Sequence, residues 1–261
     1  MTLKKSLLAC LVLALILALL AGCGSKNEST PAAEPEASAQ QNEASAPEET
    51  AESAPEAEAE TEPEAEAEPE AVHPYAWMGL QDIPKCNYLD IMSTNNYVQV
   101  YDTYVYGIKA EVTDACKGLK TYQKNGNNLS YNIEGMIYSI NLDSKQYGMV
   151  DMTESMEGVK ETMDAAIAAG TNTNGRAFQS SGSSAIPLYS EEEGDTAEYE
   201  YYEYSIGDSV TERYYMKDGD VFAIYTKTSN LESTNVIKSV SGDVSDDLFV
   251  VPDLTDFTKI N

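Results

Sequence analysis

Histidine is nearly missing from this 261-residue chain, which has a single one, His73. The chain also lacks a His-Glu-x-x-His metal motif, a Gly-x-Ser-x-Gly elbow and a glycine-rich phosphate or dinucleotide loop. The acidic clusters at 191–193, 218–220 and 246–247 do not follow the spacing of a calcium loop. We therefore predict no catalytic residue, no metal site and no cofactor, and expect a protein that is not an enzyme. A carboxylate pair brought together from distant segments is the alternative that remains open.

Basic residues are scarce, with 16 Lys and Arg against 44 Asp and Glu, a formal net charge of −28. Residues 24–71 hold 15 of the acids, which leaves 29 acidic and 13 basic residues, a net charge of −16, in residues 72–261. A surface of this sign repels phosphate groups, so we expect no nucleic-acid partner and no docking on anionic lipid headgroups. The excess of carboxylates favours solubility instead.

Long apolar runs are limited to one, Leu7–Leu20, which follows Lys4 and Lys5. Its length of 14 residues suits the apolar region of a secretory signal, since a membrane-spanning helix needs about 20. The run ends at Leu20-Ala21-Gly22-Cys23, which resembles the lipobox of bacterial lipoproteins. The resemblance implies that residues 1–22 are a signal peptide and that acyl chains on Cys23 anchor the protein to the outer face of the bacterial cell membrane. A retained membrane helix is the alternative.

Residues 24–71, which follow the expected lipidated cysteine, contain no aromatic and no branched aliphatic residue. They consist almost entirely of Glu, Ala, Pro and Ser, and proline occurs six times. Such a segment cannot bury enough apolar surface to offset the backbone entropy that folding costs. We therefore predict a disordered tether over residues 23–71, which spaces the rest of the chain from the membrane.

Cysteine is scarce too, and only Cys86 and Cys116 lie beyond the predicted tether. Disulfides persist outside the cytoplasm, so these two thiols are predicted to pair and to close a 31-residue loop. The alternative is two separate, buried thiols. The sequence has no Cys-x-x-Cys spacing, so we expect no redox role for these cysteines.

Residues 72–261 have the length of a single domain and contain all 18 tyrosines, which favour strands. Hairpin turns are predicted at Asn125-Gly126, Asp143-Ser144 and Asp218-Gly219. Residues 96–112 are predicted to form one long or bent strand with a bulge or kink at Gly107. The expected fold is mainly β, in the α+β class: an antiparallel, curved sheet or half-barrel with one main helix packed against it.

That helix is predicted to follow Thr153, whose hydroxyl would cap it, and to stop at Gly170. Apolar residues recur along it at helical spacing, with Met163 on the apolar stripe. Residues 170–197 are polar and rich in Gly, Ser and Asn, so we predict a long flexible loop there.

Three stretches resemble segments of LolA-like lipoprotein carriers and related extracytoplasmic lipoproteins: GMIYSINLDSKQYGMVDM, YYMKDGDVFAIYT and IKSVSGDVSDDLFVVPDL. The resemblance implies an unclosed half-barrel around a helix, with an apolar concave face that holds lipid. The residues assigned to ligand binding are apolar or aromatic and share strand or helix faces: Met136, Tyr138, Ile140, Met163, Phe222 and Ile224.

The function expected from the sequence is therefore non-catalytic binding by an anchored, extracytoplasmic lipoprotein. Its ligand would be a lipid or another apolar component of the envelope, held on a concave sheet face. The alternative is a structural or interaction lipoprotein that presents a tyrosine-rich surface to an envelope protein partner. The two differ in whether the domain has a ligand site or only a contact surface.

Overall fold

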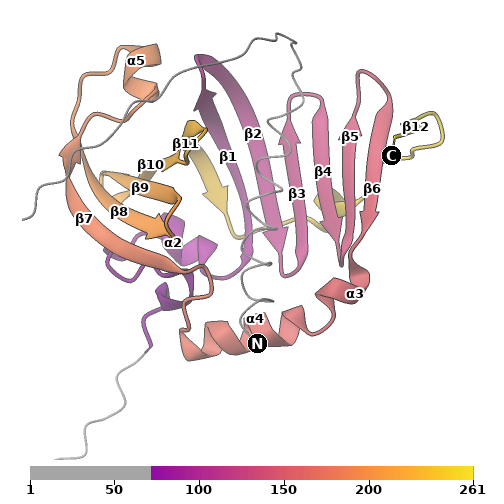
Figure 1. Cartoon of the computed structure of the whole chain (residues 1–261), viewed down its shortest axis with the longest axis horizontal. Helices are drawn as coiled ribbons and strands as arrows, with labels where there is room; N and C mark the ends of the chain where they lie inside the picture. The colour runs from indigo at the N-terminus through magenta and orange to yellow at the C-terminus, as the bar shows by residue number, and fades with distance from the viewer. Residues whose placement is uncertain (1–71, 261) are drawn as a thin grey trace, which may run out of the picture. The chain divides into compact units, whose positions relative to one another are not determined.

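The computed structural model describes residues 72–260, which form one twelve-stranded sheet with short helices around it (Figure 1). The strand order is β12-β6-β5-β4-β3-β2-β1-β11-β10-β9-β8-β7, and every pairing is antiparallel except β12 with β6. The strands are β1 Asn96–Val105, β2 Ile108–Lys117, β3 Lys120–Asn125, β4 Asn128–Ile133, β5 Met136–Asn141, β6 Gln146–Asp151, β7 Arg176–Ser184, β8 Tyr199–Ile206, β9 Val210–Lys217, β10 Asp220–Lys227, β11 Glu232–Ser241 and β12 Thr258–Lys259. The helical elements are η1 Ala76–Met78, α2 Asn87–Met92, α3 Thr153–Met156, α4 Val159–Ala169, α5 Tyr189–Glu193 and η2 Asp246–Phe249.

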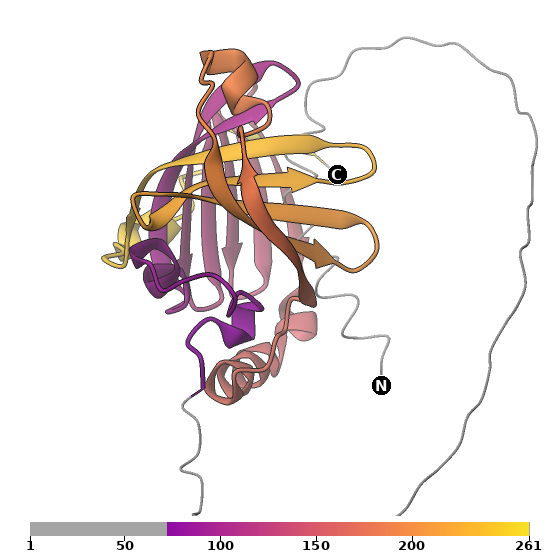
Figure 2. The same cartoon turned by 90° about the vertical axis from the view of Figure 1, so that its left-hand side faces the viewer.

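The sheet is open and strongly curved, which confirms the predicted fold class. Strands β8–β11 run across the direction of β2–β6, and β1 lies at the bend between the two halves (Figures 1 and 2). The β1–β11 register shifts between Val100 and Tyr101, and a second shift lies between Val221 and Ala223 of β10. An extra residue of this kind bends a strand and increases its twist.

The predicted hairpin turns are confirmed. Asn125 pairs with Asn128 across one turn, and Lys217 pairs with Asp220 across another. In the second turn Asp218 and Gly219 have φ of 52° and 81°, the left-handed pair that a tight hairpin needs. The long strand predicted over residues 96–112 is wrong: Gly107 is not a bulge or kink but part of the turn that divides it into β1 and β2.

The predicted helix is present but bent. It divides into α3 and α4 at Gly158, whose φ is 73°, and it ends at Gly170, as expected from the sequence. The residue before α3 is Met152 and not Thr153, and no side chain caps that end. Of the residues in α4 only Ala166 is fully buried, so the helix packs on the sheet with little apolar contact (Figure 1).

The predicted flexible loop over residues 170–197 is wrong. β7 pairs with β8 from Arg176 to Ser184, and α5 follows it. The second half of β7, from Ser180 to Ser184, consists of Ser and Gly, and most residues of the strand are exposed. β7 is an edge strand, so its backbone forms hydrogen bonds with one neighbouring strand only. Ser and Gly residues can form such a strand without apolar side chains. A search for apolar alternation therefore misses such a strand.

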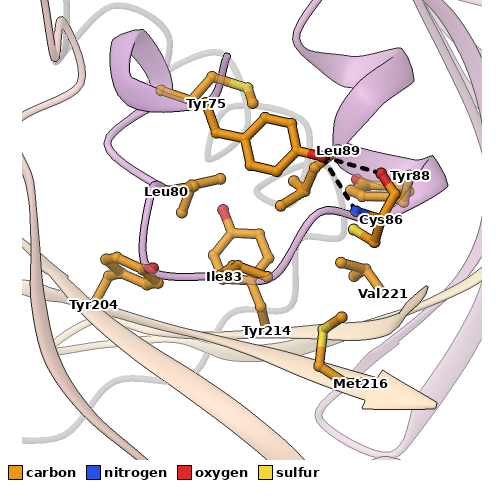
Figure 3. Close-up of a cluster of buried hydrophobic side chains, with 11 residues drawn as sticks. Tyr75, Leu80, Ile83, Cys86, Tyr88, Leu89, Tyr204, Tyr214, Met216 and Val221 are labelled. Carbon is orange, nitrogen blue, oxygen red and sulfur yellow. Dashed lines mark hydrogen bonds between the residues drawn. The ribbon is translucent and has the colours of Figure 1, made fainter. Parts of the chain in front are cut away.

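Three clusters of buried side chains form the core. Cluster 1 lies between α2 with the chain before it and strands β8–β10, and consists of Tyr75, Met78, Leu80, Ile83, Cys86, Tyr88, Leu89, Tyr204, Tyr214, Met216 and Val221 (Figure 3). Cluster 2 lies between β2–β5 and the C-terminal segment, and consists of Ala115, Tyr122, Leu129, Tyr131, Ile140, Val244 and Phe249. Cluster 3 lies between the segment after β7 and strands β1 and β9–β11, and consists of Tyr104, Ile186, Tyr215, Ala223, Tyr225 and Val236. Segments outside the sheet thus cover each of these apolar surfaces.

The predicted disulfide is wrong, because Cys86 and Cys116 are both free and buried. Cys86 packs in cluster 1, where its backbone N–H donates to the Tyr75 hydroxyl at 3.1 Å (Figure 3). Cys116 lies on β2, and its Sγ is 3.1 Å from Oδ1 of Asn95. Burial raises the pKa of the Cys86 thiol to about 11 and that of Cys116 to about 12, so both stay protonated and unreactive at neutral pH.

Candidate functional site

The six residues assigned to ligand binding do not come together in the structure. Tyr138 and Ile140 of β5 pack in or against cluster 2, beneath the C-terminal segment. Phe222 packs against cluster 3, whereas Ile224 packs against cluster 1. The two methionines are half-buried: Met136 opens β5, and Met163 lies on α4, with its Sδ 4.0 Å from Nδ2 of Asn95. These side chains stabilise different parts of the fold.

The opposite surface of β3–β6 has a different composition. Side chains alternate between the two faces of a strand. Tyr122, Leu129 and Ile140 lie on the face that packs in cluster 2, so their neighbours along each strand lie on the second face. We name this second face the amide face; its residues are Thr121, Gln123, Asn125, Asn128, Ser130, Asn132, Ile137, Ser139, Asn141, Gln146, Gly148 and Val150. Nine of the twelve carry an amide or a hydroxyl group, and none carries a charge.

The amide face is arranged in rows that cross the strands. The central row runs from Asp114 of β2 through Gln123, Ser130 and Ser139 to Gly148, each paired with the next. Its side chains become shorter toward β6. From Ser130 to Gly148 the rows on either side carry larger residues, so a strip of short side chains crosses β4–β6 between them. Asp114 stands at the opposite end of the central row, beyond Gln123.

Asp114 is a half-buried carboxylate without a basic partner. Nε2 of Gln99 donates to it at 3.1 Å, and the Tyr97 hydroxyl at 3.5 Å. Tyr88 of α2 fixes the other end of the Gln99 amide, because its hydroxyl donates to Oε1 at 3.0 Å. Among the ion pairs of residues 72–260, none involves Asp114.

Burial raises the pKa of Asp114 from 3.8 to about 6, although the hydrogen bonds from Gln99 and Tyr97 oppose the shift. At pH 7 the group is therefore mainly ionised, in a place that disfavours its charge. Burial also raises the pKa of Tyr97 well above 10, so this tyrosine remains a neutral donor beside the carboxylate. Asp114 thus retains acceptor capacity for a hydroxyl or ammonium group of a ligand.

The raised pKa of Asp114 predicts an unusual pH dependence of stability. The folded protein binds this proton more tightly than the unfolded chain, so the contribution of Asp114 to the free energy of unfolding should fall as pH rises from about 4 to 6. We expect Asp114→Asn to be more stable than the wild type at pH 7.5, by about 1–3 kcal/mol, and equally stable at pH 4. Urea denaturation at both pH values measures this, and a variant less stable at pH 7.5 would contradict it.

Several other charged groups on the sheet are paired with one another. Arg176 of β7 and Glu212 of β9 form an ion pair at 2.8 Å, to which the Tyr214 hydroxyl adds a hydrogen bond. Asp102 of β1 contacts Lys109 of β2 at 3.4 Å and Lys238 of β11 at 2.6 Å. These contacts hold neighbouring strands together.

A hollow of about 410 Å³ lies between the β1–β2 and β10–β11 turns and is lined by Tyr106, Leu188 and residues 227–232. Several of its polar side chains already have partners within the chain. The Tyr106 hydroxyl donates to the backbone oxygen of Asn230, and Lys227 pairs with Glu232 at 2.7 Å. None of the residues that line this hollow belongs to the amide face.

Within residues 72–260, no group of three or more His, Cys, Asp or Glu side chains is placed to hold a metal ion. In the same part of the chain, no helix has the length and apolar character needed to cross a membrane. The predicted signal peptide, the lipidated Cys23 and the tether lie outside the described residues.

Comparison with known proteins adds little. No protein-family model matches the chain, and neither does any curated protein. The chain is similar to an uncharacterized conserved protein from Thermus thermophilus, whose crystal structure is known, with 9% sequence identity and a TM-score of 0.37. The match covers 66% of this chain and 95% of that one. A TM-score this low carries no argument, so the lipobox and the LolA-like resemblance both stay predictions.

Sequence reasoning missed Asp114, Gln99 and the amide face. A signal for the face was present in KTYQKNGNNLSYN, where amide and hydroxyl residues alternate with Tyr and Leu around a hairpin turn. Asp114 had no such signal. It shares its strand face with Val112 and Cys116, and its partner Gln99 lies on another strand.

Proposed function

We propose that this chain is a lipid-anchored binding protein that works outside the bacterial cytoplasm and catalyses no reaction. In this proposal acyl chains on Cys23 hold it at the outer face of the cell membrane, and residues 24–71 tether the domain. The domain captures a component of the cell envelope on its amide face. The observation that carries the proposal is Asp114. Its carboxylate has no basic partner among the described residues and lies beside the amide face, where burial disfavours its charge.

The packing of the apolar residues bears on which ligand is favoured. Clusters 1, 2 and 3 are all covered by segments of the chain itself. The amide face offers hydrogen-bonding groups instead, and a lipid tail laid on it would leave those groups unpaired. The geometry therefore supports a polar envelope component better than the lipid expected from the sequence.

The alternative of a tyrosine-rich contact surface has less support. Ten of the 18 tyrosines are buried, among them Tyr75, Tyr204 and Tyr215 with no measurable exposure. Buried aromatic rings stabilise the core and are not available to a protein partner.

Retention on isolated envelope fractions tests the proposal. The purified full-length lipoprotein is sedimented separately with cell-wall polymer, with vesicles of the cell's phospholipids and with its membrane proteins. Val150→Glu places a charge on the amide face, where that side chain is 54% exposed. Val250→Glu, at a position 63% exposed on the C-terminal segment, is the matched control.

We expect the wild type to bind cell-wall polymer and Val150→Glu to bind it about tenfold more weakly, because a desolvated charge opposes contact. Val250→Glu should bind like the wild type. Absence of binding to every fraction, or equal losses in both variants, would contradict the proposal.

A further inference from the structure

We infer that the ligand of the amide face is a neutral, hydroxyl-rich glycan chain, which lies across β3–β6 along the central row from Asp114 to Gly148. The inference rests on the proposed function and names the class of ligand for the same face. It depends on three properties of that face: its charge, its unused hydrogen-bonding groups and the spacing of its rows.

Charge is the first property. Residues 72–261 have a net charge of −16, yet β3–β6 present no charged side chain on the amide face. A neutral surface of amides and hydroxyls can donate to and accept from sugar hydroxyls without desolvating an ion. An anionic polymer would find no basic residue there, and it would meet Asp114 at one end of the row. Neutral sugars fit this surface better than either lipids or charged polymers.

Unused hydrogen-bonding capacity is the second property. The Ser130 side chain is on the central row of the amide face and only 6% exposed, and its hydroxyl makes no hydrogen bond with any described residue. The Ser130 hydroxyl is not among the enclosed polar atoms of residues 72–260 that lack a partner, so a ligand on this face can reach it. Asp114, at the end of the same row, accepts from Gln99 and Tyr97 and retains further lone pairs. Ser130 and Asp114 are therefore two fixed contacts for ligand hydroxyls.

The flanking amides are already held in position. Nδ2 of Asn141 donates to Oδ1 of Asn128 at 2.8 Å across two strands. Oδ1 of Asn132 accepts from the backbone N–H of Gly135 at 3.0 Å. Side chains held in this way lose little conformational entropy when a ligand binds, so the rows beside the central strip are preorganised.

Row spacing is the third property. Neighbouring strands lie about 4.8 Å apart, so the central row presents one residue at each such step. The rings of a β-linked glycan repeat at a similar distance. A chain laid across the strands would therefore place one sugar near each of Gln123, Ser130, Ser139 and Gly148. The short side chains at Ser139 and Gly148 leave room for the rings between the larger flanking rows.

Titration of the full-length protein with oligosaccharides of matched length tests the inference, with heat of binding as the readout. The probes are cellohexaose and chitohexaose, which are neutral, and hexagalacturonate, which is anionic. We expect a neutral hexamer to bind and to compete with cell-wall polymer, and hexagalacturonate not to bind. Val150→Glu and Ser139→Glu should weaken binding about tenfold or more, whereas Val250→Glu should not.

Failure of the inference is distinguishable from failure of the proposed function. Suppose that cell-wall polymer or phospholipid vesicles bind the wild type and bind Val150→Glu more weakly, but neither neutral hexamer binds or competes. The glycan inference is then overturned and the binding role stands. If hexagalacturonate binds as tightly as the neutral hexamers, the charge argument is wrong and the inference falls. If no fraction and no probe binds, both are overturned.

Discussion

Replacing Arg176 with methionine is expected to lower the free energy of unfolding by about 3–5 kcal/mol, the largest loss that we expect from a single charged residue. The Arg176–Glu212 pair is mostly buried, with side chains 17% and 13% exposed. Removing the guanidinium leaves the Glu212 carboxylate buried with only the Tyr214 hydroxyl as a partner. It also removes the hydrogen bond from Nη1 to the backbone oxygen of Met78, which joins β7 to the chain before α2.

Two further variants make that result interpretable. Lys227→Met removes a cross-strand pair with side chains 56% and 42% exposed, and we expect it to cost less than about 1 kcal/mol. The double variant Arg176→Met/Glu212→Leu should regain most of the loss, because no unpaired charge then remains buried. Chemical denaturation of all three measures this. Equal costs for Arg176→Met and Lys227→Met, or no recovery in the double variant, would show that burial of an unpaired charge is not the cause.

Replacing Cys23 with serine is expected to abolish membrane attachment. Each buried methylene of an acyl chain contributes about 0.8 kcal/mol, so two or three chains hold a protein firmly and none leaves it free. Without the thiol no diacylglycerol can be attached. Labelled palmitate should enter the wild-type protein and be absent from Cys23→Ser, which should be found in the soluble extracytoplasmic fraction.

Cys10→Ser is the matched control, because Cys10 lies in the segment that the lipobox implies is removed. It should be labelled and membrane-bound like the wild type. Label in Cys23→Ser at the wild-type level would contradict the lipobox. Membrane association without label would favour the alternative of a retained helix.

The parts of the fold that local chemistry decides were predictable. Asp218-Gly219 forms a hairpin turn because both residues tolerate a positive φ, and Gly170 ends the helix for the same reason. The abundance of tyrosine favoured a sheet, and the sheet is there. Gly107 also tolerates a positive φ, but the prediction of a kink there is wrong. Tyr106 beside it has a positive φ as well, and the two residues together form a complete turn.

Where the prediction was wrong, segments far apart in the chain decided the structure. Cys86 and Cys116 do not pair, because α2 holds one against cluster 1 while β2 places the other beside Asn95. Tyr138 and Phe222 both had the pattern of a binding face, yet each packs beneath a separate covering segment. Nothing in the local sequence shows which face of a strand such a segment will cover.

The sequence by itself determined the composition of the domain, its β class, its tight turns and its excess of negative charge, because these depend on residue types and their neighbours. Only the tertiary structure decided that Asp114 lies beside Gln99, that Ser130 is buried without a described partner, and that uncharged amides share one face. The reason is physical: register and long-range packing choose the face on which a strand residue lies, and a shift by one residue would reverse it.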